Sequence, residues 1–242
     1  MRVRAIRILV ATALLLVGLA VIDSRGVGRR FWYPSYLSMT GPRSLASVLA
    51  EIGPKKRPAL LKLLSDAGVG YPPPSVVLLA YKQERVIEVW AGAGAGHRLV
   101  RSYPVLAASG GPGPKLREGD LQVPEGVYRL TVLNPNSSYH LSIRVDYPSP
   151  FDREQGRRDK RTRLGGDIYL HGKAVSIGCL AIGDANIEEL FLLAADTGLA
   201  RMRLVIAPNR AVDGGPGLPS WTGELYRAIR AEIARTQGPA GT

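Results

Sequence analysis

A run of prolines, Tyr71–Pro74, marks the point where the residue pattern of this chain changes. Consecutive prolines favour a stiff, extended backbone, and beyond them the apolar residues follow the spacing of strands. Ser75–Tyr81 is a continuous apolar strand, and Arg85–Trp90 alternates apolar and charged side chains, so together they predict a β-hairpin. The main domain is therefore expected to begin at this joint and to consist mostly of β-strands.

Glycine and proline, with 28 and 18 residues, divide the rest of this segment and predict many turns. Further strands are expected within Arg98–Ala108, Gly126–Leu133, Ser138–Val145 and Met202–Ala207. Long loops are expected at Ser109–Glu125 and Tyr147–Gly166, and amphipathic helices from the cap Asp184 to Gly198 and at Glu224–Thr236. The prediction is a mostly antiparallel β domain of the α+β class with peripheral helices.

The chain opens with an apolar run, Ile8–Ile22, that follows several arginines. This is the layout of an export segment, and the run is shorter than the roughly 20 residues that span a bilayer comfortably. A cleaved signal peptide and an uncleaved membrane anchor are both open alternatives, and each places the remainder outside the cytoplasm. Four segments follow from this: 1–28 signal or anchor, 29–71 linker and short helices at Ser44–Ile52 and Pro58–Asp66, 72–210 main domain, and 211–242 helical tail packed on it.

The formal net charge of +12 arises from 32 lysines and arginines against 20 acidic residues. Such an excess favours an anionic partner. Nucleic acid is not the expected one, because the chain is exported and has no basic stripe interleaved with aromatic residues. Anionic lipid headgroups or an acidic wall polymer fit the charge, and so does an arginine-rich surface that is merely solvated. The arginine-rich loop Tyr147–Gly166 is accordingly either an anion-binding rim or lid, or a solvated loop.

Cys179 is the only cysteine of the chain, and it ends the segment HGKAVSIGC that begins at His171. An exported chain with one cysteine cannot form an internal disulfide, so the thiol is free, bonded to another chain or kept for reactivity. A thiolate nucleophile needs a nearby base, and His171 is the candidate. Gly172 and Gly178 allow tight turns, and amides around Gly178 and Cys179 could stabilise an oxyanion. A buried structural cysteine is the competing interpretation.

The other two histidines, His97 and His140, share no metal-binding spacing with Cys179 or with an acidic helix motif. We therefore predict neither a metal site nor a cofactor. The run Ala91–Gly96 is rich in glycine, but no helix opens after it, as a phosphate-binding fingerprint requires. A flexible hairpin loop is the favoured interpretation of this run.

Tyr169–Gly172 followed by Ser176–Cys179 resembles the signature of the L,D-transpeptidase (YkuD-type) family, in which a His-Gly turn precedes a Ser-x-Gly-Cys loop. Other segments resemble the YafK-type branch of that family: Ser109–Asp120, Pro124–Gly126, Asn134–Ser137, Tyr139–Ser142 and Ile187–Glu189. The resemblance extends over roughly Pro72–Ala207. It implies an L,D-transpeptidase-like β-sandwich or barrel in the periplasm or cell envelope, acting on peptidoglycan stem peptides.

By this resemblance Cys179 is the acylating nucleophile and His171 its base, the carbonyl of Gly172 orients the imidazole, and Ser176 with Gly178 shapes the nucleophile loop. In the family the thiolate attacks the amide after a diamino acid, expels D-alanine and leaves a thioester. An amine resolves the thioester as a cross-link or a protein attachment. Water resolves it as hydrolysis.

Two positions depart from the wider family. Ile177 stands where most members have histidine, and Ala181 where most have an arginine after the cysteine. The first leaves His171 as the sole nearby imidazole, and the second removes a cationic contact. We expect a cysteine acyltransferase of the cell wall, with a wall-attached protein as one acceptor and the membrane as a partner if the N-terminal segment is uncleaved. A hydrolase or amidase of the same branch and a non-catalytic wall-binding protein are the alternatives.

Overall fold

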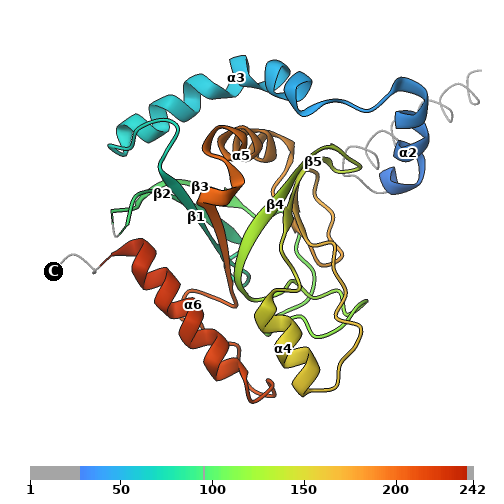
Figure 1. The fold of residues 1–242 in the computed structure, drawn as a ribbon, viewed down its shortest axis with the longest axis vertical. Helices are drawn as coiled ribbons and strands as arrows, with labels where there is room; N and C mark the ends of the chain where they lie inside the picture. The colour runs from blue at the N-terminus through green and yellow to red at the C-terminus, as the bar shows by residue number, and fades with distance from the viewer. Residues whose placement is uncertain (1–27, 95, 239–242) are drawn as a thin grey trace, which may run out of the picture.

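The computed structural model describes residues 28–94 and 96–238, so the apolar run Ile8–Ile22 lies outside the described residues (Figure 1). None of the helices in these ranges combines the length and the apolar character that a membrane span requires. The described chain forms an α+β fold with one sheet and helices on both of its faces. The predicted class, α+β with peripheral helices, is confirmed in this respect.

The sheet has eight strands in the order β3-β2-β1-β8-β4-β5-β6-β7. Their bounds are β1 Ser75–Tyr81, β2 Val86–Gly92, β3 Arg98–Pro104, β4 Gly126–Ser137, β5 His140–Val145, β6 Tyr169–His171, β7 Leu180–Ala181 and β8 Met202–Ala207. The β1–β8 and β6–β7 pairs are parallel, and the others are antiparallel. A bridge between Ala107 and Ala181 brings the segment after β3 beside β7, so the sheet curls back on itself.

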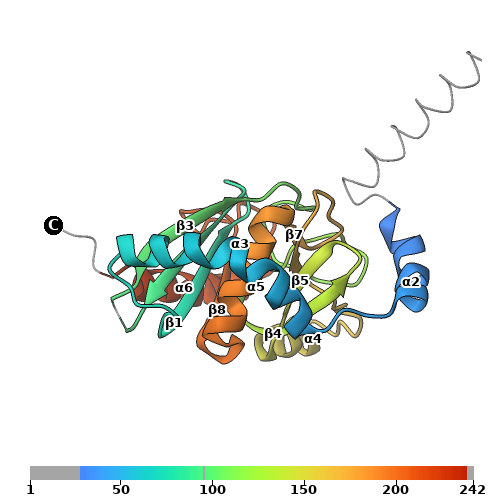
Figure 2. The same ribbon diagram turned by 90° about the horizontal axis from the view of Figure 1, so that it is seen from above.

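Side chains of β1 alternate between two hydrophobic clusters, which explains why this strand is apolar throughout. Val76 and Leu78 pack in the larger cluster beneath α5 (Asp184–Thr197) and α3 (Leu45–Asp66). Val77 and Leu79 point to the opposite face and pack with α6 (Thr222–Gln237). Figure 1 shows α3 and α5 on one side of the sheet and α6 on the other, and Figure 2 shows α3 lying across α5.

The region before the sheet is more helical than expected. The two short helices predicted at Ser44–Ile52 and Pro58–Asp66 are one helix, α3, which contains Pro54 and Pro58. A proline inside a helix removes a backbone donor and crowds the preceding turn, but α3 packs along α5 and buries residues on both sides of the prolines, including Ile52 and Leu60. Tertiary packing therefore overrides the two stop signals. The part of the 29–71 segment that precedes the predicted short helices, expected to be linker, also contains a helix, α2 (Arg29–Thr40).

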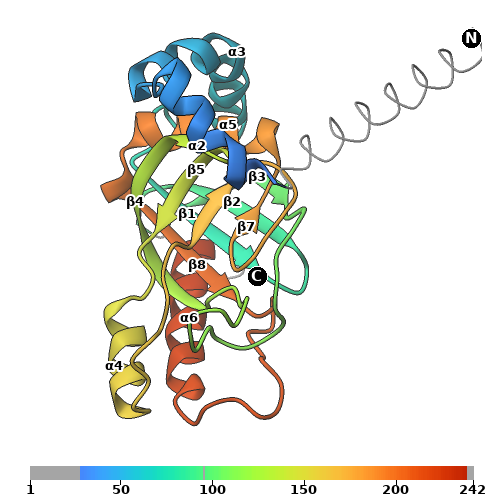
Figure 3. The ribbon, with the colours of Figure 1, turned by 90° about the vertical axis from the view of Figure 1, so that its right-hand side faces the viewer.

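Three further details differ from the prediction. The arginine-rich loop contains a helix, α4 (Pro150–Arg158), whose start is fixed by a capping box between Ser149 and Asp152. Strand β4 does not end at Leu133 as expected but continues to Ser137. Gly183, not Asp184, is the N-cap of α5, because the Asp184 carboxylate is engaged by a neighbouring turn. Figure 3 shows α4 below the lower end of β4 and α2 at the upper end of β5, on the side that faces the viewer.

Candidate active site

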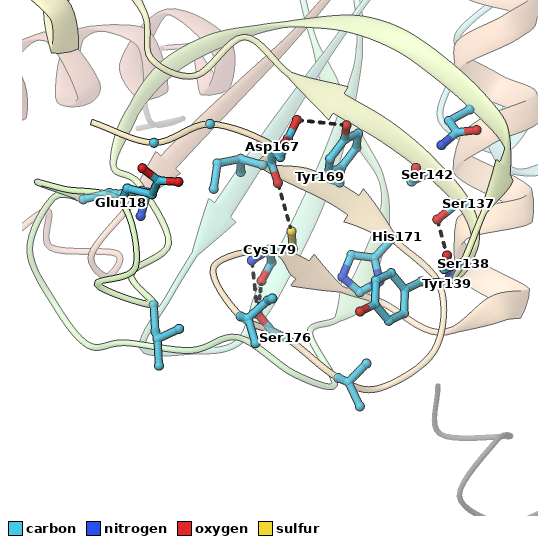
Figure 4. A pocket seen from close by; sticks show the side chains of 18 of the residues that line it. Glu118, Ser137, Ser138, Tyr139, Ser142, Asp167, Tyr169, His171, Ser176 and Cys179 are labelled. Carbon is cyan, nitrogen blue, oxygen red and sulfur yellow. Dashed lines mark hydrogen bonds between the residues drawn. The ribbon is translucent and has the colours of Figure 1, made fainter. Parts of the chain in front are cut away.

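Three of the predicted site residues, His171, Ser176 and Cys179, line one cleft of about 520 Å³, and Gly172 and Gly178 are their chain neighbours. Its walls come from the β4–β5 turn, from β6, from the loop that leads into β7 and from the loop before β4. Figure 4 shows Cys179 and His171 in the middle of the cleft. The acidic residues Glu118 and Asp167 lie towards one end of it, and Ser137 and Ser138 lie towards the other. Strands β6 and β7 pair in parallel, with His171 opposite Ala181. Cys179, which directly precedes β7, therefore lies beside β6, the strand that ends in His171.

His171 is buried, with 2% of its surface exposed. Its Nδ1 lies 2.6 Å from the carbonyl oxygen of Gly172. A carbonyl only accepts hydrogen bonds, so Nδ1 carries the proton, and in the neutral ring Nε2 holds a lone pair. Burial lowers the pKa of His171, although the Gly172 carbonyl and the charge of Asp184 oppose this shift. The imidazole is therefore neutral at neutral pH and able to accept a proton.

The turn after His171 has no space for a side chain at Gly172. A Cβ there would lie 2.6 Å from Asp184 Oδ1 and 2.7 Å from the carbonyl oxygen of Tyr139. The same Asp184 carboxylate accepts from the Lys173 amide at 2.8 Å and pairs with the Lys173 ammonium at 2.7 Å. Asp184 thus fixes the turn that presents the carbonyl of Gly172 to the imidazole.

Tyr139 covers the imidazole of His171. The centroids of the two rings lie 4.8 Å apart and their planes are tilted by 33°. Tyr139 comes from the β4–β5 turn and lines the cleft (Figure 4). Sequence reasoning gave this residue no role, because only the register of β5 against β6, with Ser142 opposite His171, brings the two rings together.

The nucleophile loop is organised by the hydroxyl group of Ser176. This oxygen accepts from the amides of Cys179 at 3.1 Å and Gly178 at 3.3 Å, and it donates to the carbonyl of Cys179 at 2.6 Å. Gly178 has a φ of 116°, which only glycine adopts readily. The two amides expected to face an oxyanion are thus engaged by Ser176 in this arrangement.

The thiol of Cys179 is weakly partnered. Its Sγ donates to the carbonyl oxygen of Asp167 across 3.6 Å, and burial raises its pKa to about 11. Beside it, Ile177 is 62% exposed at the cleft, whereas Ala181 is buried in β7. The resting pair is therefore a neutral thiol and a neutral imidazole.

The other histidines are held elsewhere. Nε2 of His97 lies 2.9 Å from the hydroxyl of Ser75, and Nε2 of His140 lies 2.8 Å from Glu188. Within residues 28–94 and 96–238, no group of three histidine, cysteine or acidic side chains could hold a metal ion. His140 is nevertheless close to the site, because a Cβ added at Gly172 would lie 3.1 Å from the Cβ of His140.

Most charges of the arginine-rich segment are paired locally. Arg157 and Arg158 both bind Glu154, Arg163 binds Glu118 at 2.8 Å, and Arg161 binds Asp159 at 2.9 Å. Arginines with carboxylate partners attract a distant anion less than free ones. This arrangement favours the solvated surface over the anion-binding rim.

A family model of the L,D-transpeptidase catalytic domain, YkuD, matches residues 75–205, more than half of the chain. The chain therefore belongs to the YkuD L,D-transpeptidase family. Among individual proteins, YafK of Escherichia coli strain K12 is 33% identical over 143 residues, a match that covers 57% of this chain and 56% of YafK. The chain thus spans little more than half the length of this relative.

Two solved structures are similar to parts of this chain at lower identity. The helical cell shape determining protein Pgp2 from Campylobacter jejuni is 22% identical, with a TM-score of 0.46 over 56% of this chain and 48% of Pgp2. L,D-transpeptidase 1 from Mycobacterium tuberculosis is 16% identical, with a TM-score of 0.32 over 55% of this chain and 61% of that protein.

Proposed function

We propose that this chain is an exported L,D-transpeptidase of the periplasm or cell envelope that acts on peptidoglycan stem peptides through a thioester on Cys179. The observation that carries the proposal is the pairing, in one cleft, of a free thiol with an imidazole whose tautomer is fixed by the Gly172 carbonyl. Membership of the family supports the reaction class.

The acidity of the two groups determines how the thiol is activated. A thiol of pKa about 11 is ionised in about one molecule in 10⁴ at pH 7, so a preformed thiolate is a minor species. The neutral His171 accepts the proton at Nε2 as Sγ attacks the carbonyl carbon of the donor peptide. The imidazolium that forms donates from Nδ1 to the carbonyl of Gly172 and is favoured by the nearby charge of Asp184.

The first half of the reaction ends in an acyl-enzyme. The tetrahedral intermediate collapses, the carbon–nitrogen bond breaks, and the leaving amine of D-alanine takes the proton from His171. The acyl group remains on Sγ of Cys179 as a thioester. In the second half an acceptor amine attacks the thioester carbonyl, His171 takes the amine proton, and the thiol is regenerated with that proton. The acceptor is a second stem peptide or the side chain of a wall-attached protein.

The two ends of the cleft suit a peptide that carries both amides and charges. Asn134, Ser137 and Ser142 at one end offer neutral hydrogen-bonding groups. The other end carries the carboxylates of Asp167 and Glu118, the second of which is paired with Arg163. Backbone amides of a stem peptide match the first set. The ammonium group of a diamino acid matches the second.

Hydrolysis of the same thioester is a second candidate, favoured by Ile177 and Ala181. Neither residue offers an imidazole or a cation beside the nucleophile, and Ile177 exposes 62% of its surface there. An acceptor amine has fewer polar partners at this edge than the wider family provides. Water needs fewer. A hydrolase or amidase would share every step up to the thioester.

The deciding experiment incubates the enzyme with muropeptides and reads product masses. Cross-linked dimers support transfer, whereas shortened stems or a released protein anchor support hydrolysis. Cys179→Ala is the control, and we expect it to remove all products while the fold persists. Full activity of Cys179→Ala would reject Cys179 as the nucleophile. The lack of any product, together with the lack of any acyl adduct on Cys179 with either muropeptides or a carbapenem, would favour a non-catalytic wall-binding protein instead.

A further inference from the structure

Arg43, in the link between α2 and α3, holds the turn that lies over the catalytic cleft. Its backbone amide donates to Asn136 Oδ1 at 2.8 Å, and the Asn136 amide group donates back to the carbonyl of Arg43 at 2.8 Å. Its guanidinium donates to the carbonyls of Pro135 at 2.6 Å and His140 at 3.3 Å. One arginine therefore joins both ends of the 135–140 turn to the link, which passes the tips of β4 and β5 (Figure 1).

The other side of the 135–140 turn is held by α5 and α3. Nε2 of His140 lies 2.8 Å from Glu188 of α5, whose other carboxylate oxygen pairs with Lys56 of α3 at 3.1 Å. His140 has a φ of 80°, a conformation that surrounding contacts must enforce in a residue other than glycine. Contacts from both sides therefore set the position of the residue between these anchors, Tyr139.

We propose that Tyr139 is a positioning residue whose ring holds the His171 imidazole for proton transfer, and that Arg43 fixes Tyr139 in that place. The inference rests on the proposed role of His171 as the base. Sequence spacing did not indicate it, since Tyr139 and His171 meet only through the β5–β6 register.

The physical reason is that one hydrogen bond does not fix a ring. The bond from Nδ1 to Gly172 sets the direction of one edge of the imidazole, but the ring can still tilt about that bond. Tyr139, stacked at 4.8 Å, restricts this tilt and excludes water from one face. Misplacing a catalytic group by about 1 Å can lower the rate by about 10²-fold. A stacked ring at this position is therefore worth a measurable factor in acylation.

The test compares Tyr139→Leu, which removes the ring, with Tyr139→Phe, which keeps it. The measurement is the rate at which a carbapenem acylates Cys179, followed by intact mass from pH 5 to 9. We expect Tyr139→Leu to react about 30-fold to 100-fold more slowly, and Tyr139→Phe to recover the rate to within about threefold. Equal losses in both variants would assign the effect to the hydroxyl group and overturn the proposal, as would an unchanged rate in Tyr139→Leu.

The pH profile separates positioning from general damage. The charged or titratable groups around His171 are Tyr139 and His140 from the 135–140 turn, Lys173 and Asp184 behind Gly172, and Cys179 in the same cleft. All of them except Tyr139 are kept in these variants. Without the ring, water reaches the imidazole, the lowering of its pKa by burial weakens, and the acid limb of the profile moves to higher pH. Tyr139→Phe should leave that limb in place. A slower Tyr139→Leu with an unmoved limb would contradict the role.

Arg43→Met tests the same idea from outside the cleft. We expect acylation to slow by about fivefold to tenfold, because the 135–140 turn loses the two guanidinium bonds to the carbonyls of Pro135 and His140 and keeps only the bonds of Asn136 to the Arg43 backbone. Arg129→Met is the matched control: Arg129 is an exposed arginine of β4 that pairs with Asp146 at 2.8 Å, and its loss should change the rate less than twofold. Equal rates in the two variants would overturn the part assigned to Arg43. If the wild-type chain forms no adduct on Cys179, the proposed function fails instead.

Discussion

Two buried polar clusters on this sheet differ in how completely their groups are bonded. Behind the loop that precedes β4, the Lys82 ammonium donates to the carbonyls of Gly113 and Val123 and to Glu125, all within 3.0 Å. Glu125 also accepts from the amide of Gly113 and from the hydroxyl of Tyr226 on α6. Burial lowers the pKa of Lys82, and the facing Glu125 carboxylate opposes this shift. Every charged atom in this cluster has a partner.

The polar groups in the cleft are not fully hydrogen-bonded in this way. The thiol of Cys179 has a long contact to the carbonyl of Asp167 and a hydrogen bond with the backbone of Tyr169, and the ring nitrogens of His171 have one hydrogen bond between them in the described structure. Saturated networks stabilise a fold, whereas unsaturated titratable groups in a cleft are available to a substrate. Under the proposed function, the saturated cluster serves stability and the cluster in the cleft serves chemistry, and four changes test this comparison.

The largest expected effect is on chemistry alone. His171→Gln keeps a side chain of similar length but removes the base, so we expect acylation of Cys179 by a carbapenem to fall by about 10³-fold, within the range for a general base. Such a factor equals about 4 kcal/mol of activation free energy. Thermal unfolding should change little, because His171 makes only one side-chain hydrogen bond. A large loss of stability with near-normal acylation would reverse the assignment.

The next effect is on stability. Glu125→Leu leaves Lys82 charged and buried without its partner, and the side chains of the pair are 0% and 6% exposed. Breaking such a pair costs about 3–5 kcal/mol, which urea unfolding would measure. The matched control is Asp66→Asn in the exposed pair with Lys62, where the loss should stay below about 1 kcal/mol.

A double variant sharpens the same test. Lys82→Met combined with Glu125→Leu removes both charges, so we expect it to recover most of the stability lost in Glu125→Leu. If the double variant is less stable than Glu125→Leu, the bonds of Lys82 to the carbonyls of Gly113 and Val123 matter more than its pairing with Glu125.

The third test uses pH. Because burial raises the pKa of Cys179 from 9.0 to about 11, alkylation by iodoacetamide should keep rising about tenfold per pH unit until about pH 11. Folding favours the protonated thiol, so its stabilising effect is present below pH 9.0 and is lost as the pH rises to about 11. Cys179→Ala should lack that part of the pH dependence. A reactivity plateau near neutral pH would instead show a preformed thiolate–imidazolium pair.

Periodic segments were the predictable part of the fold. Met202–Ala207 forms β8 as expected, and the apolar spacing after Asp184 forms α5 up to Thr197. Both are local patterns whose burial follows from their own residues. The continuity of α3 was not predictable, since Pro54 and Pro58 are local stop signals that only its packing against α5 overrides.

The residues of the candidate site also fall into a predictable and an unpredictable group. His171, Gly172 and Cys179 lie within one short segment, so their spacing and family resemblance allowed them to be predicted together, and the structure places them in one cleft or at its edge. Tyr139 contacts His171, and Arg43 contacts Asn136, although the two residues of each pair are far apart in the sequence. Sequence spacing carries no information about such contacts, and the register of β5 on β6 supplies it.

The smallest effect concerns the hydroxyl group that organises the nucleophile loop. Ser176→Ala removes two accepted bonds and one donated bond around Cys179, so we expect a loss of about 1 kcal/mol in unfolding free energy and about fivefold slower acylation, because the loop samples more conformations. Ser109→Ala is the matched control, since its hydroxyl makes one contact of 3.4 Å to Ser176 and its loss should be nearly neutral. Faster acylation in Ser176→Ala would show that the released amides of Gly178 and Cys179 bind the oxyanion, and the loop would then belong to the reacting cluster itself.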